Sequence, residues 1–469
     1  MVAGGVGPRW RRQSPIATSV ARSTGAPSKL SIPASPHMGR PDGTIPRRLA
    51  SPAPPSGPLP ATARKARSAV FVTYNGLLDP LGASQILPYL ERLHPTWPVH
   101  ILSFERSARL ARPGALAEME ARLRRQGIGW TWRRYHKSPS LPATTWDVLQ
   151  GVRALRRILR EEDVGLVHAR GYIPATIALR ATRRHPILFD IRGLQAEEYV
   201  DGGVWKEGGL KFRLAKRVER EMFARAAGAV VLTKAIAPYA IARFAEQGRE
   251  PPIEVIPCCV DLDAFDVDPD ERADVRQRLG IAPRTTVFVY SGSLGTWYLP
   301  AEMARFVKTF RDVTGRAVHL LWLVNNAPEI ARQASRDGGL AEREFTVLGV
   351  PAAEVPRHLA AGDAAVALIR PCFSKRSSSP TKYAEALAVG LPLLISRDVG
   401  DGGDIEERDG AIALGHPAAA GAMEDAARRL ARLMEKPRAH FRALARQMFD
   451  VDTVALPAYR RLYERLGRP

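Results

Sequence analysis

Two short stretches decide the fold: VFVTYNG at residues 70–76 and VFVYSG at residues 287–292. Each is a run of β-branched and aromatic residues that leads directly into a glycine loop. Such runs predict buried strands, and the segment at residues 83–93 that follows the first one has the apolar spacing of a helix. The similarity of the two openings predicts that one architecture is used twice in this chain.

Further apolar runs of strand length follow each opening, with helix-length segments between most of them. They lie at residues 99–103, 165–168, 186–191, 229–232 and 253–256, and again at 317–324, 345–350, 364–368 and 391–396. Alternation of strands and helices predicts parallel sheets covered by helices, so the fold class is α/β with two Rossmann-like domains. Open sheets of this kind bind ligands outside the carboxyl ends of their strands, which predicts a cleft between the domains.

Composition adds the domain limits. The 469 residues hold 69 Lys+Arg against 48 Asp+Glu, a net charge of +21, and eleven of the bases but only one acid lie in residues 1–67. That segment is rich in Pro, Ser and Arg, so we expect a disordered basic tail; an organellar transit peptide, a basic arm for anionic lipid or nucleic acid, and a start codon placed too early are the alternatives. We then expect an N-terminal domain over 68–258, a linker over 259–270, a C-terminal domain over 271–450 and a terminal helix over 451–469 that can pack back on the N-terminal domain.

Two classes of site are disfavoured by the sequence. The acidic segment DLDAFDVD at residues 261–268 imitates a metal-binding DxD pair, but it lies in the expected linker without a histidine nearby, so we predict no metal. The three cysteines, Cys258, Cys259 and Cys372, offer neither a disulfide framework nor zinc-ligand spacing. A reducing, cytoplasmic location follows, and no apolar stretch is long enough to cross a membrane.

Four segments give the chain a familiar pattern: DPLGASQILPYL (79–90), VIPCCVD (255–261), SGSLGTWY (291–298) and SPTKYAEALAVGLP (379–392). In this order and spacing they resemble family-four glycosyltransferases. The resemblance implies the GT-B fold, an N-terminal acceptor domain and a C-terminal donor domain. It also implies transfer of a sugar from a nucleoside diphosphate to an acceptor, with retention of anomeric configuration and without a bound metal or other cofactor.

The last of these segments carries the expected donor site. Pro380 suits the first turn of a helix, so Lys382 lies where free N–H groups and a positive dipole end already favour a diphosphate. Glu385 lies three residues later on the same face and is expected to accept hydrogen bonds from the ribose, as the second glutamate of the family's E-x7-E motif does. Ser379 and Thr381 belong to the same expected site. The alternative is a plain Lys382–Glu385 surface pair.

Two departures from the family pattern leave the donor sugar open. Ser377 stands where the first glutamate of the E-x7-E motif is expected, and the 291–298 loop lacks the Arg or Lys that many relatives place against the diphosphate. Only the hydroxyl of Ser293 and the backbone at Gly295 are left there as expected donor contacts.

In the N-terminal domain the candidates are Gly82, His168, Arg192 and Glu198. A glycine at the start of the first helix lets a ligand approach the backbone, although a tight turn explains Gly82 as well. His168 ends a strand and is expected to face the cleft, with a buried core histidine as the alternative. The segment DIRGLQAEE (190–198) resembles one seen in a subset of these transferases, which points Arg192 and Glu198 to the acceptor side; the alternative is an internal ion pair.

The resulting interpretation is a retaining, metal-independent glycosyltransferase of polysaccharide or cell-envelope biosynthesis, with a nucleotide-sugar donor and a saccharide or lipid-linked acceptor. An inactive glycosyltransferase-like scaffold is the first alternative, because of the two departures. A nucleotide-sugar epimerase and a basic nucleic-acid-binding protein are less favoured. Residues 209–225 predict an amphipathic helix with Leu210 and Leu214 in a core stripe and a basic opposite face, so peripheral contact with an anionic membrane is a further expectation.

Overall fold

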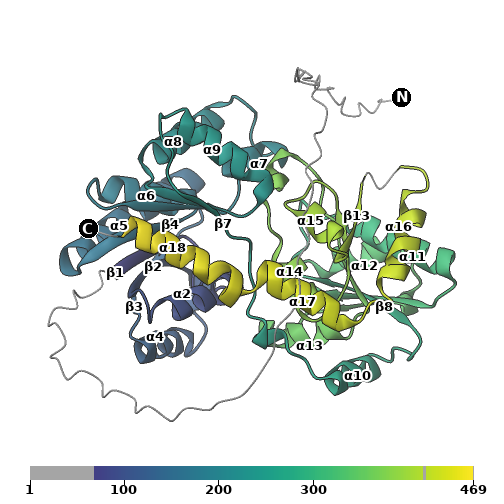
Figure 1. The fold of residues 1–469 in the computed structure, drawn as a ribbon. Helices are drawn as coiled ribbons and strands as arrows, with labels where there is room; N and C mark the ends of the chain where they lie inside the picture. Colours follow the sequence, from purple (N-terminus) through teal and green to yellow (C-terminus); the bar gives the residue numbers. More distant parts are fainter. Residues whose placement is uncertain (1–67, 416–418, 468–469) are drawn as a thin grey trace, which may run out of the picture. The chain divides into compact units, whose positions relative to one another are not determined.

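Two parallel sheets organise the part of the chain that the computed structural model describes, residues 68–415 and 419–467 (Figure 1). The prediction of a tail over 1–67 lies outside the described residues. Every strand pairing in both sheets is parallel, and the strands between the edges are buried on both faces. Burial on both faces explains why these strands read as continuous apolar runs rather than as alternating ones. The predicted α/β class with two Rossmann-like domains is confirmed.

The first sheet has the strand order β3-β2-β1-β4-β5-β6-β7. Its strands are β1 (Ser68–Thr73), β2 (Val99–Arg106), β3 (Gly129–Tyr135), β4 (Val164–Arg170), β5 (Ile187–Ile191), β6 (Gly228–Val231) and β7 (Ile253–Val255). The order reverses between β1 and β4, the switch point at which such sheets bind ligands.

The second sheet has the order β10-β9-β8-β11-β12-β13 and its switch point between β8 and β11. Its strands are β8 (Thr286–Ser291), β9 (Val318–Leu323), β10 (Phe345–Leu348), β11 (Ala364–Ala367), β12 (Leu393–Ser396) and β13 (Ala411–Leu414). The loops after β8 and β11 contain the SGSLGTWY and SPTK segments. Both segments therefore lie at one edge of one sheet.

Helices cover both sheets. In the first half they are α1 (Pro80–Gln85), α2 (Leu87–Leu93), α3 (Ser107–Leu110), α4 (Ala115–Gln126), α5 (Ser140–Glu161), α6 (Tyr172–Ala181), α7 (Gln195–Asp201), α8 (Leu210–Arg225) and α9 (Ala237–Ala245). In the second half they are α10 (Pro269–Arg278), α11 (Pro300–Thr314), α12 (Pro328–Asp337), α13 (Val355–Ala360), α14 (Thr381–Ala388), α15 (Gly402–Glu407), α16 (Ala422–Leu433), α17 (Arg438–Phe449) and α18 (Leu456–Leu466).

Three local features differ from the sequence prediction. The helix expected over 83–93 is divided into α1 and α2 at Ile86, whose backbone leaves the helical region two residues before Pro88. A proline inside a helix has no N–H for the preceding turn, which accounts for the break. The strands β3 and β13 were not predicted, because the edge strand β3 (GWTWRRY) mixes aromatic, hydroxyl and basic residues and β13 is only four residues long.

The terminal helix α18 packs against the first sheet rather than against the second domain that precedes it. Tyr459, Leu462 and Tyr463 form one buried cluster with Ala69 of β1 and Leu166 of β4. The hydroxyl of Tyr463 lies 2.7 Å from Nδ1 of His168, which is buried in β4. The chain therefore crosses from the second domain back to the first, and the last helix completes the core of the N-terminal domain.

This contact gives a test of how α18 stabilises the fold. Replacing Tyr463 by Phe keeps the packing but leaves a buried histidine nitrogen without its partner, so we expect a loss of about 1–3 kcal/mol in the free energy of unfolding. Urea unfolding followed by tryptophan fluorescence measures it. Tyr199→Phe is the matched control, because Tyr199 is partly exposed and its hydroxyl has no hydrogen bond within the described residues. Equal midpoints for both variants would contradict the stabilising role of the Tyr463 hydroxyl.

Candidate active site

Lys382 lies in the first turn of α14, directly beside the loop that follows β8. Its Nζ donates a hydrogen bond to the hydroxyl of Tyr290 at 2.9 Å and lies 4.2 Å and 3.8 Å from the ring centroids of Tyr290 and Tyr298. Within the described residues no carboxylate lies within 4 Å of this ammonium group. The charge is therefore held by two aromatic rings and one hydroxyl, a weaker compensation than an ion pair.

Removal from water is the main effect on this lysine. It lowers the pKa of Lys382 to about 7, and the neighbouring charge of Glu385 opposes that shift only in part. A bound diphosphate would supply the negative charge that the site lacks. At the start of α14, the amides of Thr381 and Lys382 have no acceptor among the described residues, whereas that of Tyr383 donates to the carbonyl of Pro380 at 3.0 Å.

Glu385 lies one turn along the same helix and is half-buried. Burial raises the pKa of Glu385, and Lys382 opposes the shift. No hydrogen bond or ion pair of its carboxylate is found among the described residues, so the expected alternative of a simple Lys382–Glu385 surface pair is wrong. Two ionisable groups that face the same space without pairing are typical of a ligand site.

The loop after β8 is held in place by its own strand. Tyr290 accepts a hydrogen bond from Lys382 and donates one to the carbonyl of Ser293 at 2.8 Å. Ser293 and Gly295 are exposed, as expected for residues that offer a hydroxyl and a backbone to a ligand. Gly292 has φ of 119°, and a Cβ there would lie 3.2 Å from Nζ of Lys382, so glycine is needed for the lysine to approach.

Ser379 and Thr381 flank the start of α14 but differ in their surroundings. The hydroxyl of Ser379 accepts a hydrogen bond from the amide of Cys258 at 3.0 Å, which ties this loop to the segment between the domains. Thr381 is half-buried as the first residue of α14, with Pro380 as its N-cap. Thr381 remains a candidate donor contact, whereas Ser379 has a structural partner.

The segment η5 (Phe373–Ser377) contacts α7 of the other domain, and this contact involves two predicted residues. Nζ of Lys375 donates to Glu198 at 2.9 Å and lies 4.1 Å from the ring centroid of Trp297. Ser377, at the position of the missing glutamate, is buried; its hydroxyl donates to the carbonyl of Ser374 at 2.6 Å and accepts from the amide of Leu194 at 3.2 Å. Glu198 therefore forms an ion pair inside the protein, as in the alternative given above, and its partner belongs to the other domain.

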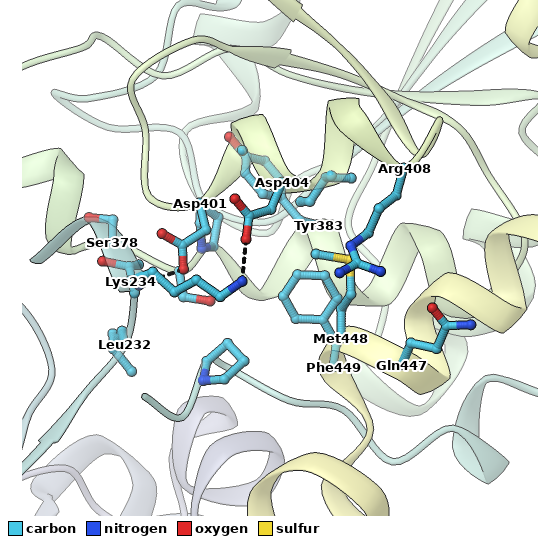
Figure 2. Close-up of a pocket in the computed structure, with 16 residues that line it drawn as sticks. Leu232, Lys234, Ser378, Tyr383, Asp401, Asp404, Arg408, Gln447, Met448 and Phe449 are labelled. Carbon is cyan, nitrogen blue, oxygen red and sulfur yellow. Dashed lines mark hydrogen bonds and ion pairs between the residues drawn. The ribbon is translucent and has the colours of Figure 1, made fainter. Parts of the chain in front are cut away.

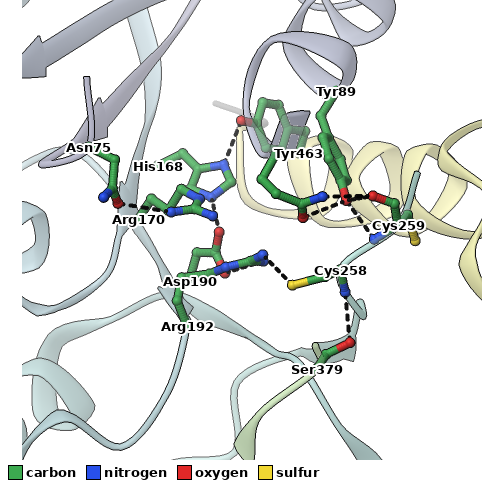
Figure 3. Close-up of polar contacts among 11 residues, drawn as sticks. Asn75, Tyr89, His168, Arg170, Asp190, Arg192, Cys258, Cys259, Ser379 and Tyr463 are labelled. Carbon is green, nitrogen blue, oxygen red and sulfur yellow. Dashed lines mark hydrogen bonds and ion pairs between the residues drawn. The ribbon is translucent and has the colours of Figure 1, made fainter. Parts of the chain in front are cut away.

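His168 does not face the cleft, contrary to the expectation. It is 1 % exposed and lies between Tyr463, at 2.7 Å from Nδ1, and Asp190, whose Oδ2 is 3.4 Å from Nε2 (Figure 3). Burial lowers the pKa of His168, so the ring is neutral at neutral pH. His168 is therefore the buried core histidine that was given above as the alternative. The rings of Phe71 and Tyr459 pack against it and occupy the space that a ligand would need.

Arg192 lies in the same polar network. Its guanidinium contacts Oδ1 of Asp190 at 3.5 Å and Sγ of Cys258 at 3.3 Å (Figure 3). Burial raises the pKa of Asp190, but Arg192 and His168 outweigh it and bring the value to about 2. This is the internal ion pair given as the alternative for Arg192. The network also contains Arg170, which donates to Asn75 at 3.2 Å at the carboxyl edge of the first sheet and which the sequence analysis missed.

The structure gives a reason for glycine at position 82. A Cβ at this position would lie 2.2 Å from the carbonyl oxygen of Gly76 and 2.7 Å from Cα of Leu77. The protein's own backbone fills the space of a side chain, as the tight turn given as the alternative requires, and the donor contact of Gly82 stays a prediction.

A separate cavity of about 160 Å³ lies between elements of both domains (Figure 2). Tyr383 and Pro380 line it from α14 and its N-cap, Lys234 lines it from the first domain, and Asp401 and Asp404 line it from the loop after β12 and the first turn of α15. Nζ of Lys234 donates to Asp404 at 2.6 Å, so these two charges in the cavity lining are paired with each other. Lys382 and Glu385 do not line it.

Three acidic residues of the linker have partners inside the protein. Asp261 pairs with Arg92 at 2.8 Å, Asp266 with Arg442 at 2.8 Å, and Asp268 caps α10 by accepting from the amide of Asp270. No group of His, Cys, Asp and Glu suited to a metal ion is found within residues 68–415 and 419–467. Helices of the described segments are also too short or too polar to cross a membrane.

Tyr290, Tyr298 and Lys375 are site residues that the sequence analysis did not single out. From the sequence, the two tyrosines have the pattern of core aromatics, because Tyr290 lies at the end of an apolar strand. Lys375 is one of two cations in a Ser-rich loop and has no distinguishing pattern. The position of Tyr290 just before a glycine loop at a switch point was the usable signal.

Comparison with known proteins matches both domains in chain order. Residues 85–264 match the model described as Glycosyltransferase Family 4, and residues 285–435 match Glycosyl transferases group 1. A GDP-mannose-dependent alpha-(1-6)-phosphatidylinositol monomannoside mannosyltransferase from Mycolicibacterium smegmatis is 30% identical over 173 residues, which are 35% of this chain and 44% of that protein. The protein of the same name from Mycobacterium tuberculosis is 25% identical over 283 residues, 59% of this chain and 68% of the relative.

Among solved structures, Anabaena Alr3699/HepE in complex with UDP superimposes with a TM-score of 0.60 at 15% identity, covering 85% of this chain and all of that one. At this identity the superposition establishes the fold alone, which is the GT-B arrangement of two Rossmann-like domains. The first family match covers most of the N-terminal domain, and the second covers most of the C-terminal domain. The chain therefore belongs to the family-four glycosyltransferases.

Proposed function

We propose that the protein transfers a sugar from a nucleoside-diphosphate sugar to an acceptor, with retention of anomeric configuration. The observation that carries this proposal is the Lys382 ammonium, held between Tyr290 and Tyr298 at the N-terminus of α14 without a carboxylate partner. An unpaired cation at a helix N-terminus attracts the negative charge of a diphosphate. Neither a scaffold nor a nucleic-acid-binding protein needs an unpaired lysine inside an interdomain site.

The diphosphate would lie across the first turn of α14 and the loop after β8. Lys382, the first-turn amides and the exposed hydroxyl of Ser293 offer donors there. When the bond to the sugar breaks, the leaving diphosphate gains negative charge, and a fixed cation lowers the barrier by stabilising that charge. The lysine therefore acts mainly in the transition state.

Glu385 would accept hydrogen bonds from the ribose of the same nucleotide. Its carboxylate lies one turn along α14 and has no other partner within the described residues. This contact would be equally strong before and during the reaction, because the ribose carries no developing charge. Its contribution belongs to donor binding.

We propose that neither a metal ion nor a further cofactor takes part. The phosphate charge would be met by Lys382 and backbone amides. The catalytic assignments of His168 and Arg192 are replaced by structural ones, since both residues serve the buried network around Asp190. Glu198 would act indirectly by holding Lys375, and with it η5, next to the site.

The relatives favour a guanine nucleotide and a lipid-borne acceptor as the first substrates to test. Two of them are named as GDP-mannose-dependent mannosyltransferases acting on a phosphatidylinositol monomannoside, whereas the solved structure holds UDP. Stabilisation of the full chain by GDP, UDP or ADP at a hundred times its Kd would be about 2.7 kcal/mol for the correct nucleotide.

Helix α8 supports peripheral contact with an anionic membrane. Leu210 and Leu214 are 77 % and 55 % exposed, and Val204 just before the helix is 68 % exposed, so the predicted core stripe is wrong for the first half of α8. Exposed basic side chains without partners among the described residues lie close to these three in sequence; they are Lys206, Lys211, Arg213 and Arg217. Exposed apolar side chains next to bases favour binding to the surface of an anionic bilayer.

Substitution of the two donor residues should produce different kinetic defects. Lys382→Ala removes a contact that grows stronger in the transition state, so kcat should fall by about 10- to 150-fold, equivalent to about 1.5–3 kcal/mol. Glu385→Ala should raise the donor KM more than it lowers kcat, because a uniform binding contact is lost. Steady-state kinetics with a varied nucleotide-sugar concentration separate the two effects.

Lys137→Ala and Glu120→Ala are the matched controls, since both side chains are exposed and without partners in the described residues. All assays contain EDTA. Wild-type kcat and KM in both site variants would place the donor elsewhere, and activity that requires added Mg²⁺ would contradict the metal-free part of the proposal.

The depressed pKa of Lys382 predicts a pH-dependent donor affinity. The protonated lysine binds the diphosphate, and the bound anion raises its pKa, so affinity is complete below about pH 7 and falls by up to about tenfold per pH unit above it. Kd for an intact nucleotide sugar, measured by calorimetry between about pH 6.5 and 8.5, tests this because the diphosphate diester does not titrate there. Lys382→Arg should remove the slope. A flat wild-type profile, or the same slope in Lys382→Arg, would refute it.

Membrane contact can be tested with a matched pair of helix-terminal substitutions. Leu210 begins α8 and Ile330 lies in the first turn of α12, and both are exposed. Leu210→Asp should reduce co-sedimentation with phosphatidylglycerol vesicles about tenfold, because an apolar anchor is replaced by a charge repelled by the lipid. Ile330→Asp should bind like the wild type. Equal loss in both variants, or no binding by the wild type, would exclude this surface.

A further inference from the structure

An open cavity of about 410 Å³ lies at the edge of the second sheet opposite to the proposed donor site. Its wall includes Thr286, the first residue of β8, as well as Asp363 just before β11 and Pro392 just before β12. Because both sheets are parallel, these amino ends of the strands lie at the edge away from the loops that carry Lys382 and Ser293. The cavity is therefore separate from the donor site.

The lining of this cavity is strongly basic. One carboxylate, that of Asp363, faces six basic side chains, which are Arg272, Arg276, Arg284, Arg316, Lys436 and Arg438. We call this the arginine cavity. Its volume lies in the range of small-molecule sites and exceeds what a single phosphate group needs.

Asp363 offsets only one of these six positive charges, and both of its oxygens already accept hydrogen bonds. Oδ1 accepts from Arg272 at 2.5 Å, and Oδ2 accepts from Arg276 at 3.2 Å and from the amide of Val287 at 2.8 Å. Arg276 also donates to the carbonyl of Thr285. These two arginines form a fixed, partly buried floor.

Arg438 adds a third guanidinium with no carboxylate within 4 Å in the described segments. It donates to the carbonyls of Val389, at 3.1 Å, and Gly362. Burial first, and then repulsion by Arg272 and Arg276, lowers the pKa of Arg438 to about 10. Positive charges are thus held together although they destabilise one another, which an anion would relieve.

Arg284 and Arg316 stand at the rim. Both are exposed, and no partner of either guanidinium is found within residues 68–415 and 419–467. Nζ of Lys436 donates to Asp409 at 2.8 Å, so this lysine adds less unpaired positive charge to the cavity than the two arginines do. The rim therefore has two guanidiniums free to close over a ligand above a fixed basic floor.

We propose that the arginine cavity binds a phosphate-bearing anion at a second site, independent of the nucleotide-sugar donor. Guanidinium groups match phosphate oxygens in bidentate pairs, and several of them at one place favour more than one phosphate group. The phosphates can come from a soluble polyphosphate or from a lipid headgroup, and the experiment separates these sources.

The test uses inorganic tripolyphosphate and isothermal titration calorimetry on the full chain. Arg284→Glu/Arg316→Glu should weaken binding by at least about tenfold, because two charge-assisted contacts become repulsive. Arg124→Glu/Arg125→Glu makes the same charge change at two exposed arginines of α4 and should stay within about twofold of the wild type. Lys382→Ala should leave this affinity unchanged, and Arg284→Gln/Arg316→Gln repeats the test without charge reversal.

A second arm uses vesicles that contain phosphatidylinositol phosphate. Vesicle binding that is lost in the Arg284/Arg316 variants but kept in the Arg124/Arg125 variant supports the site with a lipid source, and calorimetric binding without vesicle binding supports a soluble source. The proposal fails if neither probe binds, if both double variants lose binding equally, or if Lys382→Ala alone abolishes it.

Discussion

The site depends on one constraint: a lysine ammonium is kept partly away from water with only aromatic rings and a hydroxyl to compensate it. Lys382 can occupy this place because Gly292 leaves room beside it and because Tyr290 is fixed by the carbonyl of Ser293. A cation without a counter-ion is costly to bury. That cost is recovered when an anion binds, so the same arrangement that destabilises the free protein favours a diphosphate.

The two domains hold this arrangement through contacts at the cleft and the hinge. Glu198 binds Lys375 next to Trp297, and the buried hydroxyl of Ser377 accepts a hydrogen bond from Leu194. Serine thus performs an interdomain role at the position where a glutamate was expected. At this position the chain therefore has a contact between the domains in place of the carboxylate that the family pattern predicts.

The sequence predicted the parts of the molecule that local patterns determine. Apolar runs located eleven of the thirteen strands in the described residues, and the order of the loops predicted that Lys382 and Glu385 lie on one helix at the carboxyl edge of the second sheet. Contacts between distant segments could not be predicted, since nothing near His168 in sequence indicates that Tyr463, 295 residues later, closes over it. Leu210 and Leu214 have the spacing of a core stripe, but only the fold shows that no element covers them.

The most direct test of the donor site is a crystal structure of the full chain with GDP or UDP bound. We predict that a diphosphate oxygen lies within hydrogen-bond distance of Nζ of Lys382 and of the first-turn amides of α14, with the ribose against Glu385. A diphosphate bound in the arginine cavity or in the cavity lined by Tyr383 and Asp404, with Lys382 still enclosed by Tyr290 and Tyr298, would contradict the assignment.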